Sequence, residues 1–341
     1  MWRRIWTIFE ARNKEFYRDK SALGWNFLFP FLIIIGFNLM FSGDRQNIYK
    51  VGYVGDTTSI EYTTEFKAFQ QTKYIEFITF DSRESALDKL LHHRIDLLIH
   101  PAEGKYWVSS SSPKGYVVEQ LLKAQNGGQS IFLRQSVNGR EIPYVEWLFP
   151  GILGMNIMFS SLFGVGFVVV RYRKNGVLKR LSVTPTRPYE FLTAQVISRM
   201  FLLMATTAIV YTGCAMLYGF QCRGSYLTLI LVFALGGFSM IALGLLIASR
   251  SSSEEFAGGI LNLTTWPMMF LSEVWFSLEG AEPWVQKLAR IFPLTHMIDS
   301  ARKVMNDGAS LYDIRYQIIT LIAMSSLFLL FGSLLFKWQK D

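Results

Sequence analysis

Long apolar stretches alternate with shorter polar ones along most of this chain of 341 residues. A bilayer core about 30 Å thick requires about 20 apolar residues in a helix, a run that the core of a soluble domain does not need. The pattern therefore predicts an α-helical membrane protein with six transmembrane helices. The predicted spans are residues 22–41, 147–170, 191–220, 226–248, 256–276 and 316–336.

Residues 44–145 have a different pattern, in which short apolar runs are separated by turn residues. This spacing is typical of the strands and amphipathic helices of a soluble α/β domain. We therefore predict such a domain between the first and second spans. Strands are expected over 47–56, 74–80, 95–101 and 105–112, and helices over 82–94 and 115–137.

The first twenty residues predict an amphipathic helix that lies in the membrane interface. One face recurs at helical spacing, and basic residues occupy most of the remaining arc. A plain basic anchor for the first span is the alternative. The residues of the recurring face are Trp2, Ile5, Trp6, Phe9, Asn13 and Phe16.

The distribution of charge predicts the orientation of the chain. Residues 1–20 and 171–190 each carry six Lys and Arg, whereas residues 44–145 carry twelve Lys and Arg against twelve Asp and Glu. Short loops rich in Lys and Arg remain cytoplasmic, so both termini are expected inside and residues 44–145 outside. The net charge of +8 is then mainly a topology signal. Nucleic-acid binding is not expected, because no basic face is interleaved with stacking aromatics.

The basic loop after the second span reads RYRKNGVLKRLSVTPTRPYEFL over residues 171–192. Gly176 permits a break after the span, and the Thr184-Pro185 step ends the short helix that follows. In that helix Leu178 and Leu181 form an apolar side. A loop that only marked topology would need the charges but not the Gly, Leu and Pro residues. The segment therefore predicts a short rigid helix at the cytoplasmic surface, suited to docking into a groove on a partner.

Catalytic and metal-binding patterns are not found in the sequence. The four His residues have no zinc-site spacing, and no paired carboxylates stand out beyond Glu254 and Glu255. The phosphate-binding pattern G-x-x-x-x-G-K-[ST] is also missing from the sequence. If the protein uses ATP, another chain is expected to bind it.

Several residues within the predicted spans are candidates for function. Arg199 lies about two turns into the third span, where a charge is costly; it is expected either to pair with Glu254 or Glu255 or to reach the cytoplasmic surface. Met, aromatic and Asn side chains in spans two and five could contact a lipid-like or drug-like cargo. Packing against lipid or a second subunit is the alternative. The candidate cargo contacts are Asn156, Phe159, Asn262, Trp266, Met269 and Phe270.

Three segments together resemble the membrane subunits of type-2 ABC exporters, of the drug-resistance permease kind. They are RKNGVLKRLSVTPTRP, TTWPMMFLSEVWF and EPWVQKLARIFPLTHMIDSAR, in that order. The resemblance covers nearly the whole chain, and the large outer domain is similar to that of the longer branch of the family.

The resemblance implies a half-transporter of a bacterial cytoplasmic membrane, without a nucleotide site of its own. Two permease subunits, identical or related, would bind two cytoplasmic ATPase subunits that hold ATP and Mg. Membrane lipid is an expected partner, and a periplasmic adaptor is left open. The implied organisation is an interfacial helix over 1–20, a first span over 21–43, the outer domain over 44–145, and spans two to six over 146–341 with a coupling loop at 171–190 and an outer re-entrant hairpin at 279–308. The implied coupling residues are Gly176, Leu178, Lys179, Arg180, Leu181, Thr184 and Pro185.

Two other functions are compatible with parts of the sequence. A membrane-anchored sensor or assembly protein could bind a ligand or partner through the outer α/β domain. A membrane-bound enzyme would require a buried acid–base or metal cluster, which the sequence does not display.

Overall fold

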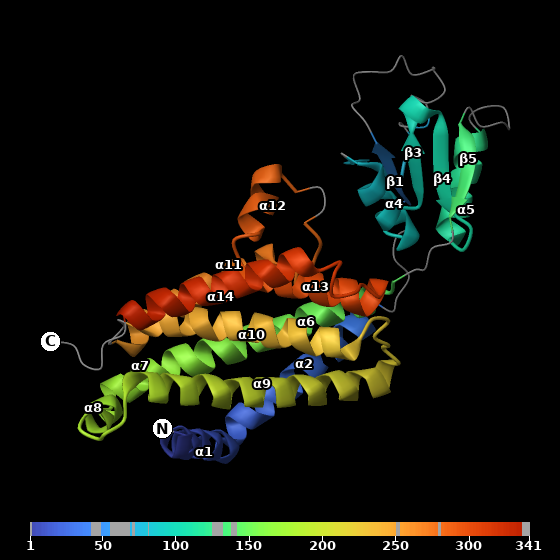
Figure 1. Cartoon of the computed structure of the whole chain (residues 1–341). Helices are drawn as coiled ribbons and strands as arrows, with labels where there is room; N and C mark the ends of the chain where they lie inside the picture. Colours follow the sequence, from blue (N-terminus) through green and yellow to red (C-terminus); the bar gives the residue numbers. More distant parts are fainter. Residues whose placement is uncertain are drawn as a thin grey trace. The chain divides into compact units, whose positions relative to one another are not determined.

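A computed structural model describes residues 2–41, 49–54, 69, 72–80, 82–124, 132–137, 142–249, 253–278 and 281–335. The chain divides into two compact units (Figure 1). One unit combines residues 1–40 with 145–341 and is helical, and the other comprises residues 41–144 and contains the sheet.

The helical unit is built from a series of α-helices and one short π-helix, η2, that interrupts the second span. α9 begins at a proline and ends at Gly219, whose left-handed backbone (φ 68°) terminates the helix. The elements are α1 (Trp2–Arg18), α2 (Lys20–Phe41), α6 (Tyr144–Ser161), η2 (Leu162–Phe167), α7 (Val168–Lys174), α8 (Val177–Ser182), α9 (Pro188–Tyr218), α10 (Tyr226–Ala248), α11 (Glu254–Leu271), α12 (Pro283–Ala289), α13 (Pro293–Asp307) and α14 (Arg315–Leu335).

Four helical segments are long and apolar enough to cross a membrane: residues 144–174, 189–218, 226–248 and 315–335. There is a fifth candidate segment if α1 and residues 23–37 of α2 are counted together as one span; the two helices meet at a bend of 61°. The fold is therefore that of a mainly helical, multi-pass membrane protein with a small sheet. The predicted span at 256–276 corresponds to α11, which begins with two glutamates and is not among these segments. The count of six spans stays a prediction.

α10 lies at the centre of the helical unit and contacts α9, α13, α14 and η2. Small residues allow close approach of the neighbouring helices: Gly236 of α10 packs against Met297 of α13, and Gly154 of α6 packs against Ile298. α13 is consequently buried along much of its length. α12 and α13 are two short helices within residues 279–308, where the resemblance implies an outer re-entrant hairpin; that hairpin stays a prediction.

The second unit contains a five-stranded sheet of order β2-β1-β3-β4-β5. The β3–β4 pair is antiparallel, and the other pairs are parallel. Two of the helices that the structure describes in this unit supply buried side chains, including Leu90 from α4 and Val118 from α5. The elements are β1 (Tyr49–Val54), β2 (Ile75–Phe80), α4 (Arg83–Leu91), β3 (Leu97–His100), the 3₁₀-helix η1 (Pro101–Glu103), β4 (Lys105–Ser109), α5 (Pro113–Ala124) and β5 (Leu133–Val137).

The prediction of a helix throughout residues 115–137 is wrong in its second half. α5 ends at Ala124, and residues 133–137 form β5, which pairs with the edge of β4. The carboxylate of Glu119 on α5 accepts hydrogen bonds from Lys123 (2.7 Å) and Arg134 (2.8 Å). This tertiary ion pairing and the free edge of β4 favour a strand, and neither can be read from local periodicity.

Candidate functional site

α8 is a six-residue helix at the end of the second span, where Figure 1 shows it near α1. Gly176 precedes α8 with a left-handed backbone (φ 69°), which lets the chain turn directly out of α7. Leu178 is fully buried and packs into a core cluster that includes Val169, Phe191 and Leu245. α8 is therefore anchored to α7, α9 and α10 at once.

The polar side of α8 is open to solvent. Lys179 and Arg180 are exposed, whereas Leu181 is partly buried against the same core cluster. The Thr184 hydroxyl donates to the carbonyl of Leu181 (2.7 Å) and so closes the end of the helix. The structure thus holds a rigid, cationic surface at this end of the helical unit.

α1 is connected to the loop that follows α8. The guanidinium of Arg4 donates to the carbonyl of Pro185 and lies 3.4 Å from the carboxylate of Glu190. That carboxylate is buried and accepts a hydrogen bond from the backbone N–H of Arg187 (2.9 Å). The loop after α8 is therefore bonded both to α1 and to the start of α9.

A second set of contacts joins α1 to the second span. Arg12 forms an ion pair with Glu15 (2.7 Å) and donates to the carbonyl of Gly164 in η2 (3.0 Å). The carboxylate of Glu15 also accepts a hydrogen bond from Tyr172 of α7. Burial raises the pKa of Glu15, but the Tyr172 hydrogen bond and the charge of Arg12 outweigh it and hold this pKa below its usual value. Glu15 is thus held in its charged form at neutral pH.

Arg199 of α9 also lies beside the π-helix. Its guanidinium donates to the carbonyl and the hydroxyl of Ser160 and lies 5.8 Å from the centre of the Phe16 ring. Gly164 leaves the space that this guanidinium fills, because a Cβ at that position would overlap it. A π-turn departs from the regular backbone hydrogen-bond pattern of an α-helix. Arg12 donates to the carbonyl of Gly164 and Arg199 to that of Ser160, and these hydrogen bonds stabilise the irregular turn.

Neither arrangement predicted for Arg199 is the observed one. The carboxylates of Glu254 and Glu255 instead lie 4.0 and 3.7 Å from the ammonium of Lys174 at the end of α7. Arg199 does not reach the surface either, because it is only 7% exposed. The difference arises because η2 offers Arg199 backbone carbonyls inside the protein, which the sequence pattern does not reveal.

The end of α7 is also fixed to the next two helices. The guanidinium of Arg173 donates to the carbonyls of Ala248 (2.9 Å) and Ser249 (3.0 Å), which end α10. Lys174 reaches the first turn of α11 through the two glutamates. The segment that carries α8 therefore contacts α9, α10 and α11 by charged or buried groups.

The candidate cargo residues occupy two different surroundings. Asn156 of α6 is buried and donates to the carbonyl of Asn26 in α2 (3.2 Å), and Phe159 stacks on Phe163 (6.0 Å between ring centres). On α11 the exposed residues Asn262, Trp266 and Phe270 follow one another at intervals of four. Met269 is buried within the subunit. Three of the six residues thus form one open stripe on α11.

The sequence pattern of the family described as ABC-2 family transporter protein matches residues 20–334. The chain belongs to this family. The resemblance to the membrane subunits of type-2 ABC exporters is thereby confirmed.

Three of the named relatives that the chain matches are described as permeases. The chain is 24% identical to the inner membrane transport permease YhhJ of Escherichia coli K12 over 197 residues, which are 55% of this chain and 51% of YhhJ. It is 23% identical to the probable multidrug ABC transporter permease YbhR of the same organism, over 58% of this chain and 54% of YbhR. It is also 23% identical to the daunorubicin resistance ABC transporter permease protein DrrB1 of Streptomyces coeruleorubidus, over 50% of this chain and 61% of DrrB1. The ABC-2 chain spans about half the length of the curated relatives it matches.

The family motif lies in the loop at residues 171–190, and it does not identify the residues of α1 that contact this loop. The sequence identifies Arg4 and Arg12 only as basic residues of a predicted amphipathic helix, and it assigns no role to Glu15. The spacing of Arg12 and Glu15 by three residues permits an ion pair on one helix face. That spacing is the one local signal for the cluster, and it does not identify Gly164 or Tyr172 as its partners.

Proposed function

We propose that this protein is the permease subunit of an ATP-driven ABC exporter whose ATPase is a separate chain. The observation that carries the proposal is α8, whose buried Leu178 fixes it to the helical core while Lys179 and Arg180 are presented to solvent. Membership of the ABC-2 family supports a transport role. ATP and Mg are proposed to be held by the ATPase, because the chain has no phosphate-binding loop sequence of its own.

Force applied to α8 by a partner would reach several helices. Leu178 and Phe191 belong to one buried cluster, so a displacement of α8 changes the packing of α7 and α9 together. Arg173 extends the connection to the end of α10. Because protein cores are close-packed, a shift at such a site is passed on as a rigid-body movement rather than absorbed locally.

α1 provides a second route from the loop to the second span. Arg4 bonds to the loop at Pro185, and two turns further along α1 Arg12 bonds to Gly164 of η2. We infer that closure of the ATPases moves α1 and the π-turn together. The turn lies next to Asn156 and Phe159, two of the residues proposed to face the cargo.

The proposed cargo is a hydrophobic or amphipathic compound, drug-like or lipid-like. The support is the exposed stripe of α11, in which Trp266 and Phe270 stack (6.3 Å between ring centres) beside Asn262. Aromatic side chains with a polar neighbour suit a ligand that is mainly apolar. In a complex of two permeases, this stripe would line either the pathway or the contact between subunits.

The proposed location is a bacterial cytoplasmic membrane, with six spans and both termini in the cytoplasm. Residues 44–145 and the hairpin at 279–308 are then on the outer side. The balance of acidic and basic residues in both segments supports this orientation, because only the short loops at 1–20 and 171–190 are strongly basic.

Charge reversal on α8 tests the proposal. We expect Lys179→Glu combined with Arg180→Glu to leave the protein in the membrane at normal amounts, since both side chains are exposed. Cargo-stimulated ATP hydrolysis by the assembled complex should collapse, because the surface that docks the ATPase changes sign. The matched control is Lys287→Glu combined with Arg290→Glu at α12, since both side chains are exposed and lie outside α8. Unchanged stimulation in the α8 double variant would refute the assigned coupling role.

A further inference from the structure

A groove of about 670 Å³ lies between the first half of α1 and the first half of α9. Its volume is within the range of about 300–1,000 Å³ that is typical of sites for small ligands. The lining combines aromatic, aliphatic and basic side chains, and it includes Trp2, Arg3, Ile5, Trp6, Phe9 and Ile197. The groove therefore has both an apolar and a cationic part.

One flank of the groove is aromatic. Trp2 and Trp6 are one helical turn apart on α1, so they share a face, and they are 71% and 65% exposed. The Trp6 ring stacks on Phe9 (5.1 Å between ring centres), and Phe9 meets Phe201 of α9 edge to face (6.0 Å). Exposed tryptophans of this kind are typical of the level at which lipid chains meet their headgroups.

The adjoining flank carries a cation that has no counter-ion among the described residues. Arg3 and Thr7 are also one turn apart, and the Thr7 hydroxyl donates to the Arg3 carbonyl (2.9 Å). Within the part of the chain that the structure describes, the Arg3 guanidinium has no ion pair or hydrogen bond, whereas Arg4, Arg12 and Lys14 each pair with a glutamate. The described residues that line the groove include no acidic side chain. The charge of the groove is thus complementary to an anion.

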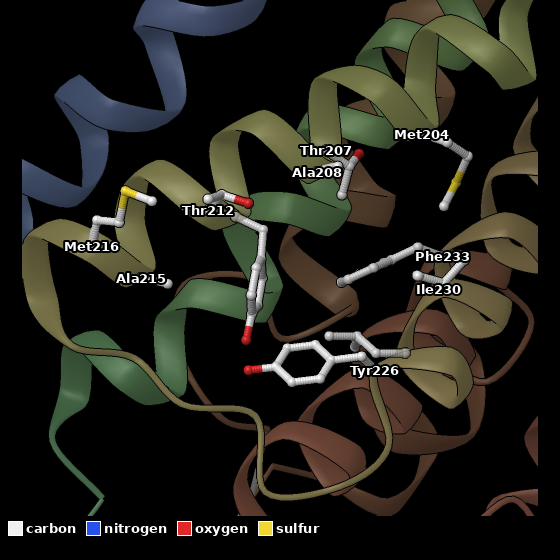
Figure 2. Close-up of a pocket in the computed structure, with 11 residues that line it drawn as sticks. Met204, Thr207, Ala208, Thr212, Ala215, Met216, Tyr226, Ile230 and Phe233 are labelled. Carbon is white, nitrogen blue, oxygen red and sulfur yellow. The ribbon is translucent and has the colours of Figure 1, made fainter.

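A second groove, between α9 and α10, has no such charge. Its volume is about 520 Å³, and Figure 2 shows Met216 at one end and Met204 and Phe233 at the other. The described residues that line this second groove include no charged side chain. It is therefore a neutral reference of similar size on the same helix α9.

We propose that the groove between α1 and α9 binds an anionic phospholipid. The Arg3 guanidinium donates hydrogen bonds to the lipid phosphate, and one acyl chain lies against Trp6, Phe9 and Ile197. A bend of 61° separates α1 from residues 23–37 of α2, so α1 can lie along the membrane surface while α2 enters the membrane. Basic side chains at that surface attract anionic lipids. The inference rests on the proposed membrane location of α1, and it does not require coupling to an ATPase.

Photolabelling of the full-length protein tests the site. The protein is placed in phosphatidylcholine nanodiscs that contain a small fraction of phosphatidylglycerol with a diazirine in one acyl chain, and labelled residues are located by mass spectrometry. A phosphatidylcholine probe with the same diazirine chain is used in parallel. We expect the phosphatidylglycerol probe to label residues 2–9 and 197–201 about fivefold more than the phosphatidylcholine probe does. The two probes should label residues 204–216 equally, because these residues line the neutral groove.

Substitutions separate the charge of the groove from its shape. Arg3→Gln should abolish the preference for phosphatidylglycerol, whereas Arg3→Lys should keep it because the charge remains. Arg18→Gln is the matched control, since it removes a charge from an exposed position of α1 outside the groove. Ile197→Trp, which fills the groove, should reduce labelling of residues 2–9 by both probes. The same change at Ile209, an exposed position of α9 outside the groove, should leave that labelling intact.

Three results would overturn the proposal. The first is equal labelling of residues 2–9 by the two probes, and the second is a preference that survives Arg3→Gln or is lost equally in Arg18→Gln. The third is a photocrosslinking amino acid at position 6 that captures another protein chain in native membranes and no lipid. Crosslinking of α8 to an ATPase is measured separately, so failure of the lipid site and failure of the proposed function are distinguishable.

Discussion

Replacement of Leu178 by alanine should release α8 from the helical core. Of the α8 side chains that the structure describes, Leu178 is the one that is fully buried. Removal of a buried leucine side chain costs about 2–5 kcal/mol. Because α8 has only six residues and lies at the end of the unit, we expect this cost to appear as local undocking rather than global unfolding. The docked form should then be weakened by about 30-fold to a few thousand-fold.

Hydrogen exchange measures this undocking directly. The amide of Arg180 donates to the carbonyl of Gly176 (3.0 Å), and the amide of Thr184 donates to that of Leu181 (3.0 Å). In Leu178→Ala both amides should exchange faster by at least about 30-fold, the factor that corresponds to 2 kcal/mol. The control is Val183→Ala, since this neighbouring side chain is 84% exposed and its loss removes little packing.

Three outcomes separate the interpretations of this experiment. Faster exchange confined to residues 177–187, with loss of cargo-stimulated ATP hydrolysis, supports α8 as a docked coupling element. Faster exchange throughout α7, α9 and α10 would mean that Leu178 stabilises the whole unit. Exchange at Arg180 and Thr184 equal to that of the wild type would refute the reasoning, because the burial of Leu178 would then contribute nothing to the position of α8.

Further predictions concern the contacts around α1 and α13. Gly164→Ala places a methyl group against the Arg199 guanidinium and should destabilise the protein by about 1–3 kcal/mol in thermal unfolding; Gly259→Ala, a helical position with open space, should be neutral or slightly stabilising. Because the folded pKa of Glu15 is lowered, its stabilising contribution is complete above the unfolded pKa near 4.5 and is lost as pH falls through the folded value. The Tm difference between wild type and Glu15→Gln should therefore shrink as pH is lowered from 7 towards 3, and a constant difference would contradict the assignment. Arg302 bonds to Glu273 (3.3 Å) and to the carbonyl of Trp147 (3.2 Å), so Arg302→Ala should cost about 2 kcal/mol or more. A double-mutant cycle with Glu273→Gln should give a non-zero coupling energy.

The elements that local patterns determine could be predicted from the sequence. The long apolar runs predict the positions of α6, α9, α10 and α14, because a helix that crosses a bilayer must be apolar over a known length. The break at Gly176 and the stop at Thr184-Pro185 gave α8, because both depend on backbone constraints of the residues themselves.

The contacts that make up the candidate site could not be predicted in the same way. Arg4 meets Pro185 across 181 positions of sequence, and Arg12 meets Gly164 across 152. These pairs exist only because α1 packs along α9, and nothing in the first eighteen residues specifies that approach. The π-turn was also missed, since η2 reads as ordinary helix and owes its support to Arg12 and Arg199.

The central claim is that α8 docks on a separate ATPase. The most direct measurement places a photocrosslinking amino acid at position 180 of the full-length protein in its native membranes and identifies the crosslinked chains by mass spectrometry. The account predicts a crosslink to a protein with the phosphate-binding loop that this chain lacks. The same amino acid at position 312, an exposed site in the turn before α14, should give no such crosslink. The account would be contradicted if crosslinking at position 180 were efficient but repeatedly captured other chains and no nucleotide-binding protein.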